Sequence, residues 1–308
     1  MKFYELPEVR EARSLINQDE LRKMTSNQSP TRFVRIASLW IMKLGVVFIA
    51  APSLSFHWWP FLFVLSVAIV EGFRNWSHES LHQRIFSRNS AINSVLTHLL
   101  IALPIMTPFG TRRTMHLSHH RGLDSESDLE RFAWRDFNPQ GLPRELWLSL
   151  SGLRFVGGAL AARNNKETNE SRQRVELVTL LSYVFVTMGF AYFFGVLIPY
   201  FMLWILPQVL VSPFINRVRS FAEHGAMSGL PVSRTTIAGP LERFFMYQVR
   251  FGYHFEHHVW PGIPENSLKK VHALLERRGF FNRWPTLIQE SGVVTTFARS
   301  HKSVDGSR

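Results

Sequence analysis

Nine of the thirteen histidines in this 308-residue chain fall into four tight groups. The groups HESLH, HLSHH, AEH and HFEHH contain His78, His82, His116, His119, His120, His224, His254, His257 and His258. In a helix, side chains three or four positions apart share one face, about 5–6 Å from each other, so two imidazoles can bind one metal ion or neighbouring ions. Nitrogen ligands suit iron, zinc, copper or nickel. Nine imidazoles are too many for one ion, so the pattern predicts a site with two metal ions.

The remaining histidines are scattered, and we interpret them as ordinary residues. They lie at a hairpin tip, in an apolar segment, on a surface helix and in the tail, as His57, His98, His272 and His301 respectively. The chain has no cysteine, which excludes disulfides, thiolate metal sites and a cysteine nucleophile.

HESLH also has the H-E-x-x-H pattern of zinc metalloproteases, in which Glu79 would be the general base. Such a protease needs only one further protein ligand and leaves the fourth zinc position to water. Seven clustered histidines count against this function because all but one of them would have no role. An intramembrane zinc metalloprotease is therefore a remote alternative.

Two long apolar blocks, Ala37–Phe73 and Leu177–Ile215, determine the expected fold. Each is about twice the length of a membrane-spanning helix and has a turn-like centre, at residues 51–60 and 195–199. We predict an all-α integral membrane protein with four transmembrane helices arranged as two hairpins. Lys43 lies near one end of the first span, where its stem could extend to the membrane interface.

Basic residues are concentrated outside these blocks, and the two hairpin tips contain none. The positive-inside rule therefore places both termini and the histidine groups in the cytoplasm. No cleavable signal is expected before the first span, because residues 1–35 are polar and charged. The net charge of +12 follows from this topology, and we do not expect nucleic acid as a partner.

The expected single membrane domain, 1–308, comprises a cytoplasmic arm (1–36), spans one and two (37–73), a cytoplasmic loop with the first two groups (74–176), spans three and four (177–215) and a cytoplasmic tail with the last groups (216–308).

A third apolar stretch, Ala91–Phe109, is long enough to suggest a fifth span. A true span would put the first and second histidine groups on opposite faces of the membrane. If the groups form one site, this stretch must be re-entrant or interfacial, and Pro104 and Pro108 would help to break it. We favour this arrangement, together with a histidine-rich cytoplasmic cap. The alternative is a fifth span with unrelated histidine groups.

The order of these motifs resembles the integral-membrane fatty acid desaturase and hydroxylase superfamily. HxxxH follows the second span, HxxHH comes about 35 residues later, and a Glu-His element and a final HxxHH follow two more spans. YHFEHHVWPGIPENSLKKVH is similar to the last histidine box of that family. HLSHHRGLDSESDLE is similar to its second box, with the trailing acidic pair near Asp124 and Asp128. The resemblance covers approximately residues 37–275.

The resemblance implies two non-haem iron ions, O2 as co-substrate and all nine grouped histidines as iron ligands. Glu79, Glu223 and Glu256 lie beside these histidines and are candidates for orienting their imidazoles. The His-Pro-Gly-Gly segment of relatives with a fused haem domain does not occur in the sequence. The resemblance therefore implies an external electron donor such as a ferredoxin or rubredoxin, with its reductase. Such carriers are typically acidic, which suits a basic cytoplasmic face.

The predicted function is an O2-dependent di-iron oxidoreductase that desaturates a fatty acyl or similar lipid-like chain. A hydroxylase or ketolase on the same scaffold, acting on a lipid, a carotenoid or another hydrophobic substrate, is the alternative, because both reactions begin with removal of hydrogen. Metal transport is disfavoured, since spans one, three and four contain almost no ionisable residues to line an ion path.

Overall fold

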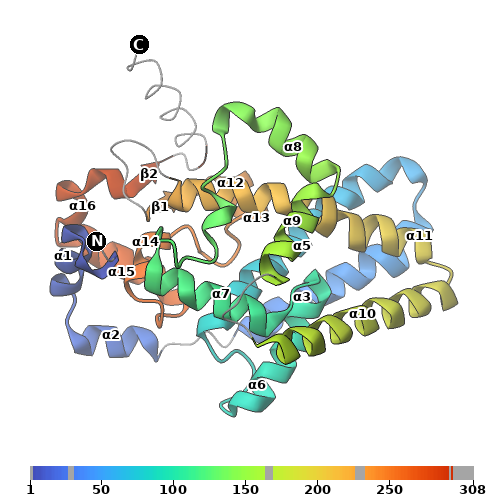
Figure 1. The fold of residues 1–308 in the computed structure, drawn as a ribbon, viewed down its shortest axis with the longest axis horizontal. Coiled ribbons are helices and arrows are strands. Elements are labelled where there is room, and N and C mark those ends of the chain that lie inside the picture. The colour runs from blue at the N-terminus through green and yellow to red at the C-terminus, as the bar shows by residue number, and fades with distance from the viewer. Residues whose placement is uncertain (1–2, 27–30, 164–168, 226–232, 291–292, 294–308) are drawn as a thin grey trace. The chain divides into compact units, whose positions relative to one another are not determined.

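The computed structural model describes residues 3–26, 31–163, 169–225, 233–290 and 293; His301 lies outside them. Helices make up most of the described chain (Figure 1). Strands β1 (Thr235–Ile237) and β2 (Ile288–Glu290) form a short parallel pair, with Thr235 opposite Ile288. The chain is therefore mostly helical, as predicted.

The chain forms two compact units, which are described separately. The first comprises residues 1–29, 116–145 and 216–308, and the second comprises residues 30–115 and 146–215. Elements of the first unit are η1 (Phe3–Glu5), α1 (Pro7–Leu15), α2 (Gln18–Thr25), η6 (Arg131–Ala133), η7 (Pro139–Gly141), β1, α13 (Pro240–Phe245), α14 (His254–Val259), α15 (Glu265–Arg277), α16 (Phe280–Arg283), η10 (Pro285–Leu287) and β2.

The second unit contains the long apolar helices. Its elements are α3 (Arg32–Leu44), η2 (Gly45–Ala50), α4 (Ala51–Ser53), η3 (Phe56–Trp58), α5 (Trp59–His82), α6 (Ser90–Thr97), η4 (His98–Ala102), η5 (Leu103–Ile105), α9 (Leu153–Arg163), α10 (Glu170–Phe193), α11 (Leu197–Tyr200), η8 (Phe201–Ile205) and η9 (Pro207–Val211). Helices α7 (Phe109–Gly122), α8 (Leu142–Leu150) and α12 (Ser212–His224) contribute residues to both units.

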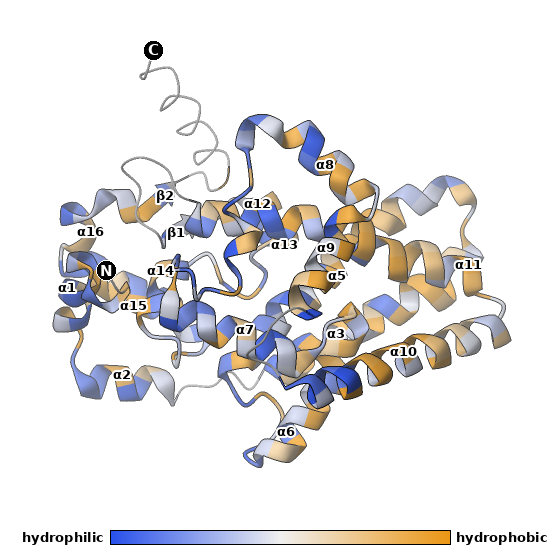
Figure 2. Cartoon of the chain, viewed as in Figure 1, coloured by the Kyte–Doolittle hydropathy of each residue, from blue (hydrophilic) through white to orange (hydrophobic). Residues whose placement is uncertain are grey.

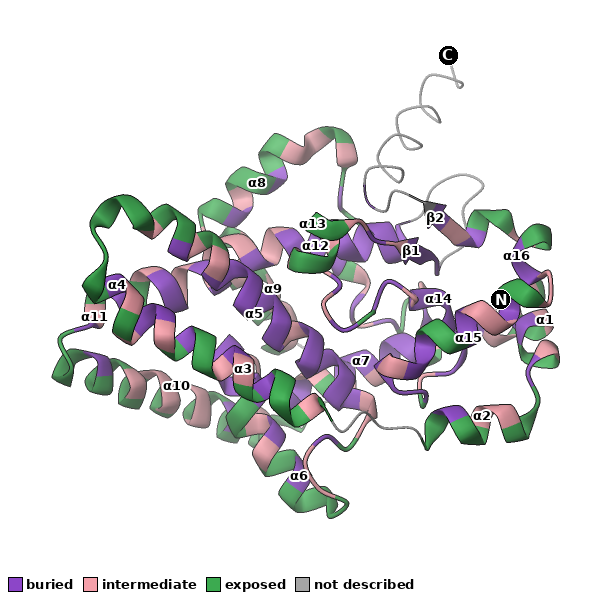
Figure 3. Cartoon of the chain, turned by 180° about the vertical axis from the view of Figure 1, so that it is seen from behind, coloured by how far each residue is buried: buried purple, intermediate pink, exposed green. Residues whose placement is uncertain are grey.

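Four helical segments of the described chain are long and apolar enough to cross a membrane: Arg32–Ser53, Phe56–His82, Glu170–Phe193 and Leu197–His224. The apolar character of α10 is visible in Figure 2, and Figure 3 shows that much of its surface is exposed within the chain. Phe185 and Phe193 of α10 are 80% and 81% exposed, as expected for side chains that contact lipid. These helices confirm the predicted number of transmembrane segments, while their arrangement as hairpins stays a prediction.

The third apolar stretch is broken. The helical segments Ser90–Ile105 and Phe109–Gly122 meet at an angle of 90°, and the chain would have a fifth span only if this bent pair were one span. Met106, within the break, has a left-handed φ of 52°. A re-entrant or interfacial position for this segment stays a prediction.

Lys43 does not extend to the interface as its position suggested, and that expectation is wrong. The side chain is 1% exposed, and its Nζ donates to the carbonyl oxygen of Leu203 at 2.6 Å. The Leu203 carbonyl lies in η8, a π-helical turn, and gives the buried ammonium group a hydrogen-bond partner in an apolar interior.

The N-terminus of α7, the helix that carries HLSHH, is capped by a carboxylate from a distant segment. Glu176 of α10 accepts hydrogen bonds from Gly110 N at 2.6 Å, from Thr111 N at 3.0 Å and from the Thr111 hydroxyl at 2.7 Å. The first N–H groups of a helix have no partner within it, and the helix dipole favours negative charge there. Glu176 therefore determines where this helix begins.

Replacing Glu176 with alanine is expected to destabilise the protein by about 2–3 kcal/mol, because charged hydrogen bonds to buried donors are lost. The measurement is the thermal unfolding midpoint of the detergent-solubilised chain. Glu170→Ala is the matched control, because Glu170 lies in the same helix and pairs with Arg174 through two largely exposed side chains. Its effect should stay below about 0.5 kcal/mol. Equal shifts for the two variants would contradict the capping role.

Candidate metal centre

Four histidines of the first unit converge although they come from three separate segments. His119 lies in α7, His224 ends α12, and His254 and His258 lie in α14. Each offers one nitrogen, and these nitrogens all lie within 4.8 Å of one another. The Nε2 atom of His258 is 3.2 Å from that of His119 and 3.2 Å from that of His254. The Nε2 atoms of His254 and His224 are 2.8 Å apart, and all four residues are buried.

Helix α14 positions two of these histidines by its own periodicity. His254 and His258 are four residues apart, so they lie on one face. A six-residue helix is not stable alone, and every residue of α14 is buried against its surroundings (Figure 3). Phe255, for example, stacks on Phe280 with 5.8 Å between ring centroids. Packing therefore holds this helix in place.

The spacing of the nitrogens fits a shared metal ion. His119 Nδ1–H donates to Asp128 at 3.0 Å, so its Nε2 carries a lone pair that faces the other imidazoles. With metal–nitrogen bonds of about 2.1 Å, nitrogens at right angles are about 3.0 Å apart and tetrahedral ones about 3.4 Å apart. The separations between Nε2 atoms, 2.8–3.2 Å, are close to these values.

The protonation of the group favours metal binding. Burial, reinforced by the neighbouring histidines, lowers the pKa of His254 and of His258 well below the ordinary value for imidazole. Both rings are therefore neutral at physiological pH and keep a lone pair for a metal. Neutral imidazole is a common ligand of transition metals.

A second set of histidines adjoins the first in the same unit. The Nε2 atoms of His116 and His120 are 3.0 Å apart, and the ring of His257 lies 4.9 Å from that of His120. The rings of His120 and His258 stack at 4.3 Å, so the two sets are in contact. Seven of the nine predicted ligands thus lie together in the first unit.

The other two predicted ligands, His78 and His82, belong to the second unit. They lie on successive turns at the end of α5, with ring centroids 5.7 Å apart. This agrees with the same-face arrangement expected from the HESLH spacing. Their role as ligands stays a prediction.

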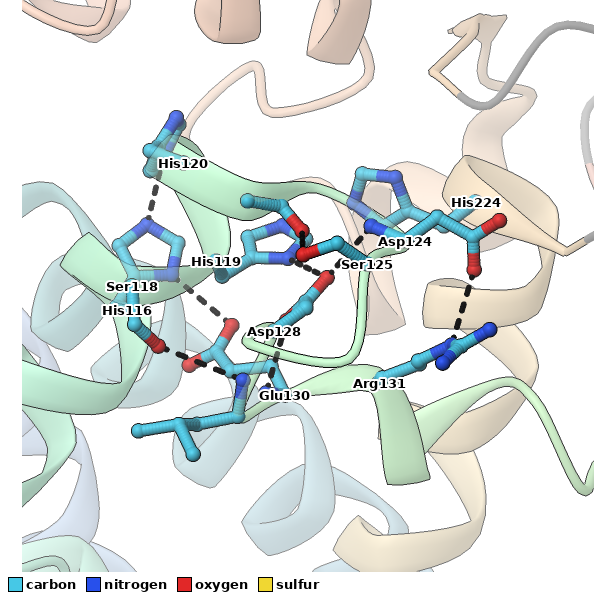
Figure 4. Close-up of polar contacts among 12 residues, drawn as sticks. His116, Ser118, His119, His120, Asp124, Ser125, Asp128, Glu130, Arg131 and His224 are labelled. Atoms are coloured by element: carbon cyan, nitrogen blue, oxygen red, sulfur yellow. Dashed lines mark hydrogen bonds and ion pairs between the residues drawn. The ribbon is translucent and has the colours of Figure 1, made fainter. Parts of the chain in front are cut away.

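Two carboxylates orient imidazoles of the second box (Figure 4). Asp128 accepts from His119 Nδ1 at 3.0 Å, and Glu130 accepts from His116 Nδ1 at 3.0 Å. Asp124, the other member of the expected acidic pair, forms an ion pair with Arg131 at 3.3 Å, and its backbone N–H donates to Asp128 at 2.9 Å. The role of Glu130 was not predicted from the sequence. Its position two residues after Asp128 could have indicated it, but only the conformation of the loop brings both carboxylates to the histidines.

The three glutamates that neighbour histidines in sequence have different partners. Glu223 lies 3.7 Å from Nε2 of His254, one of the converging imidazoles. Glu256 is fully buried and accepts from His272 Nδ1 at 2.6 Å. Glu79 is buried and lies in the second unit. His272 is 8% exposed, so its interpretation as a surface residue is wrong.

Comparison with known proteins agrees with the histidine pattern. The family model for fatty acid desaturases matches residues 56–285. Dihydrorhizobitoxine desaturase from Bradyrhizobium elkanii is 25% identical over 281 residues, which cover 83% of this chain and 79% of that protein. The family match extends over the predicted histidine boxes and over three of the four apolar helices. The chain therefore belongs to the fatty acid desaturase family and is a desaturase-type oxidoreductase of the membrane.

Proposed function

We propose that this protein is an O2-dependent di-iron desaturase that acts on a fatty acyl or similar lipid-like chain. The observation that carries the proposal is the buried convergence of His119, His224, His254 and His258, with a second histidine set beside it. The proposed ligands of the two iron ions are His78, His82, His116, His119, His120, His224, His254, His257 and His258. Family membership supports iron as the metal.

The bound iron ions would supply the oxidising power needed to remove hydrogen from an unactivated C–H bond with O2. The chain's own residues prepare the site for them. Asp128 and Glu130 keep His119 and His116 protonated at Nδ1, which leaves Nε2 as the donor atom. Burial of the imidazoles excludes water, and it favours the neutral form of His254 and His258.

The proposal includes the partners and the orientation of the protein. Both termini and the metal site face the cytoplasm, as the distribution of lysine and arginine indicates. Reducing equivalents come from an external carrier such as a ferredoxin or rubredoxin with its reductase, and the net charge of +12 would attract an acidic carrier.

The similarity to a dihydrorhizobitoxine desaturase favours a second candidate substrate. That relative's name states an action on dihydrorhizobitoxine, so a desaturation of the same kind of molecule is an alternative to a fatty acyl chain. Hydroxylation or ketone formation on a hydrophobic substrate remains the alternative reaction.

The test is metabolite and lipid profiling of a host that expresses the chain, supplied with O2 and an electron-transfer chain. We expect a product that is lighter than its precursor by two hydrogens and that disappears without O2. A product heavier than its precursor by one oxygen atom would show that the reaction is hydroxylation and not desaturation. A zinc-loaded protein that cleaves peptides, and that needs Glu79 but not His257, would overturn the proposal.

A further inference from the structure

Arg234 is a fully buried arginine that contacts the end of α12. Its Nε donates to the carbonyl of Ala222 at 3.0 Å, and its two terminal nitrogens donate to the carbonyls of Gly225 at 2.9 Å and Phe221 at 2.8 Å. Carbonyls at a helix C-terminus lack helical partners, and the helix dipole favours a cation there. Because these carbonyls flank His224, Arg234 holds the segment from which that imidazole projects.

The next residue, Thr235, contacts a different histidine segment. Its hydroxyl donates to one carboxylate oxygen of Glu256, and His272 Nδ1 donates to the other. His272 comes from α15 and packs between the rings of Tyr253, at 5.1 Å, and Phe281, at 4.6 Å. Each oxygen of this fully buried carboxylate therefore accepts a hydrogen bond.

Glu256 lies on the opposite side of α14 from the converging imidazoles. With about 100° per residue, it is about 200° around the helix from His254 and from His258. Fixing the carboxylate on one side consequently fixes the rotation of the short helix, and with it the direction of both imidazoles on the other side. Thr235 is itself held in register, because β1 pairs with β2 at Ile288.

Apolar side chains in place of Glu256, Thr235 and His272 would avoid the free-energy cost of burying polar groups. A buried carboxylate that loses a partner is destabilising, whereas replacing buried polar groups by apolar ones of equal volume is often neutral. The two hydrogen bonds to Glu256 can form only within a narrow range of rotations of α14. Apolar contacts do not restrict the rotation in this way. The network therefore favours one geometry of α14 relative to α12.

We propose that Arg234, Thr235 and His272 are positioning residues of the metal centre: Arg234 sets the position of His224, and Thr235 and His272 act through Glu256 to set the rotation of α14. The proposal rests on the proposed function, because it requires that His119, His224, His254 and His258 bind metal. None of the three positioning residues is a ligand itself.

The first test measures how tightly the full-length, detergent-solubilised protein retains iron against a competing chelator. Thr235→Val keeps the shape of the side chain and removes the hydroxyl, so we expect iron affinity to fall about 10–100-fold, as for other partners of metal-binding groups. Thr236→Val is the matched control, because Thr236 is a buried threonine of the same strand and successive side chains of a strand point to opposite faces. The control should retain iron like the original protein.

The second test uses rescue at His272. His272→Leu should weaken iron retention to a similar degree, whereas His272→Asn keeps a donor close to the position of Nδ1 and should restore most of it. If His272→Leu fails to fold, the iron affinity of Thr235→Val decides whether the positioning role holds. Unchanged iron affinity in Thr235→Val, with iron bound normally by the original protein, would overturn the positioning role alone. An original protein that binds no iron would overturn both proposals.

Discussion

His258→Ala is expected to remove iron from the protein and to abolish desaturation. The Nε2 of His258 has neighbours on two sides, 3.2 Å from His119 and 3.2 Å from His254. Its loss removes one of the four nitrogens that converge in the first unit. We expect product formation to fall by more than the roughly 100-fold that loss of an outer partner causes. Elemental analysis of the purified protein and product quantification are the measurements.

His57→Ala is the matched control for this variant. His57 is an exposed histidine in η3, outside all four histidine groups, and the substitution is chemically the same. It should leave iron content and activity unchanged. Normal iron content in His258→Ala, or equal losses in both variants, would argue against a metal centre at the four converging histidines.

Asp128→Asn is expected to lower iron affinity and activity about 10–100-fold while the chain stays folded. The carboxylate accepts a hydrogen bond from His119 Nδ1–H. This bond keeps the proton on Nδ1, so Nε2 presents its lone pair to the other imidazoles. An asparagine has nearly the same shape, but it is a weaker acceptor and can turn its NH2 group toward the ring, which favours the wrong tautomer. Iron retention against a chelator and the initial rate of product formation are the readouts.

Asp124→Asn provides the comparison within the same loop. Asp124 pairs with Arg131 rather than with a histidine, and asparagine tolerates its left-handed backbone, with φ at 60°. We expect at most a small loss of stability and unchanged iron affinity. If Asp124→Asn and Asp128→Asn weakened iron binding equally, the effect would come from the loop as a whole rather than from the His119–Asp128 hydrogen bond.

The sequence by itself determined the features that depend on neighbours along the chain. Hydropathy over some twenty residues was enough to predict the four membrane-spanning helices, because a span must satisfy its backbone internally and present apolar side chains to lipid. Spacing of three or four residues was enough to predict that His254 and His258 share a face, because helical periodicity is local. The order of the motifs was enough to indicate the family.

The tertiary structure alone decided which distant residues meet. His119, His224 and the α14 histidines belong to segments up to 139 positions apart, so no local rule could select them as one group. The same holds for Glu130 beside His116, for Lys43 at the carbonyl of Leu203, and for His272 behind Glu256. Each of these buried polar groups needs a partner, and long-range packing determines where that partner comes from.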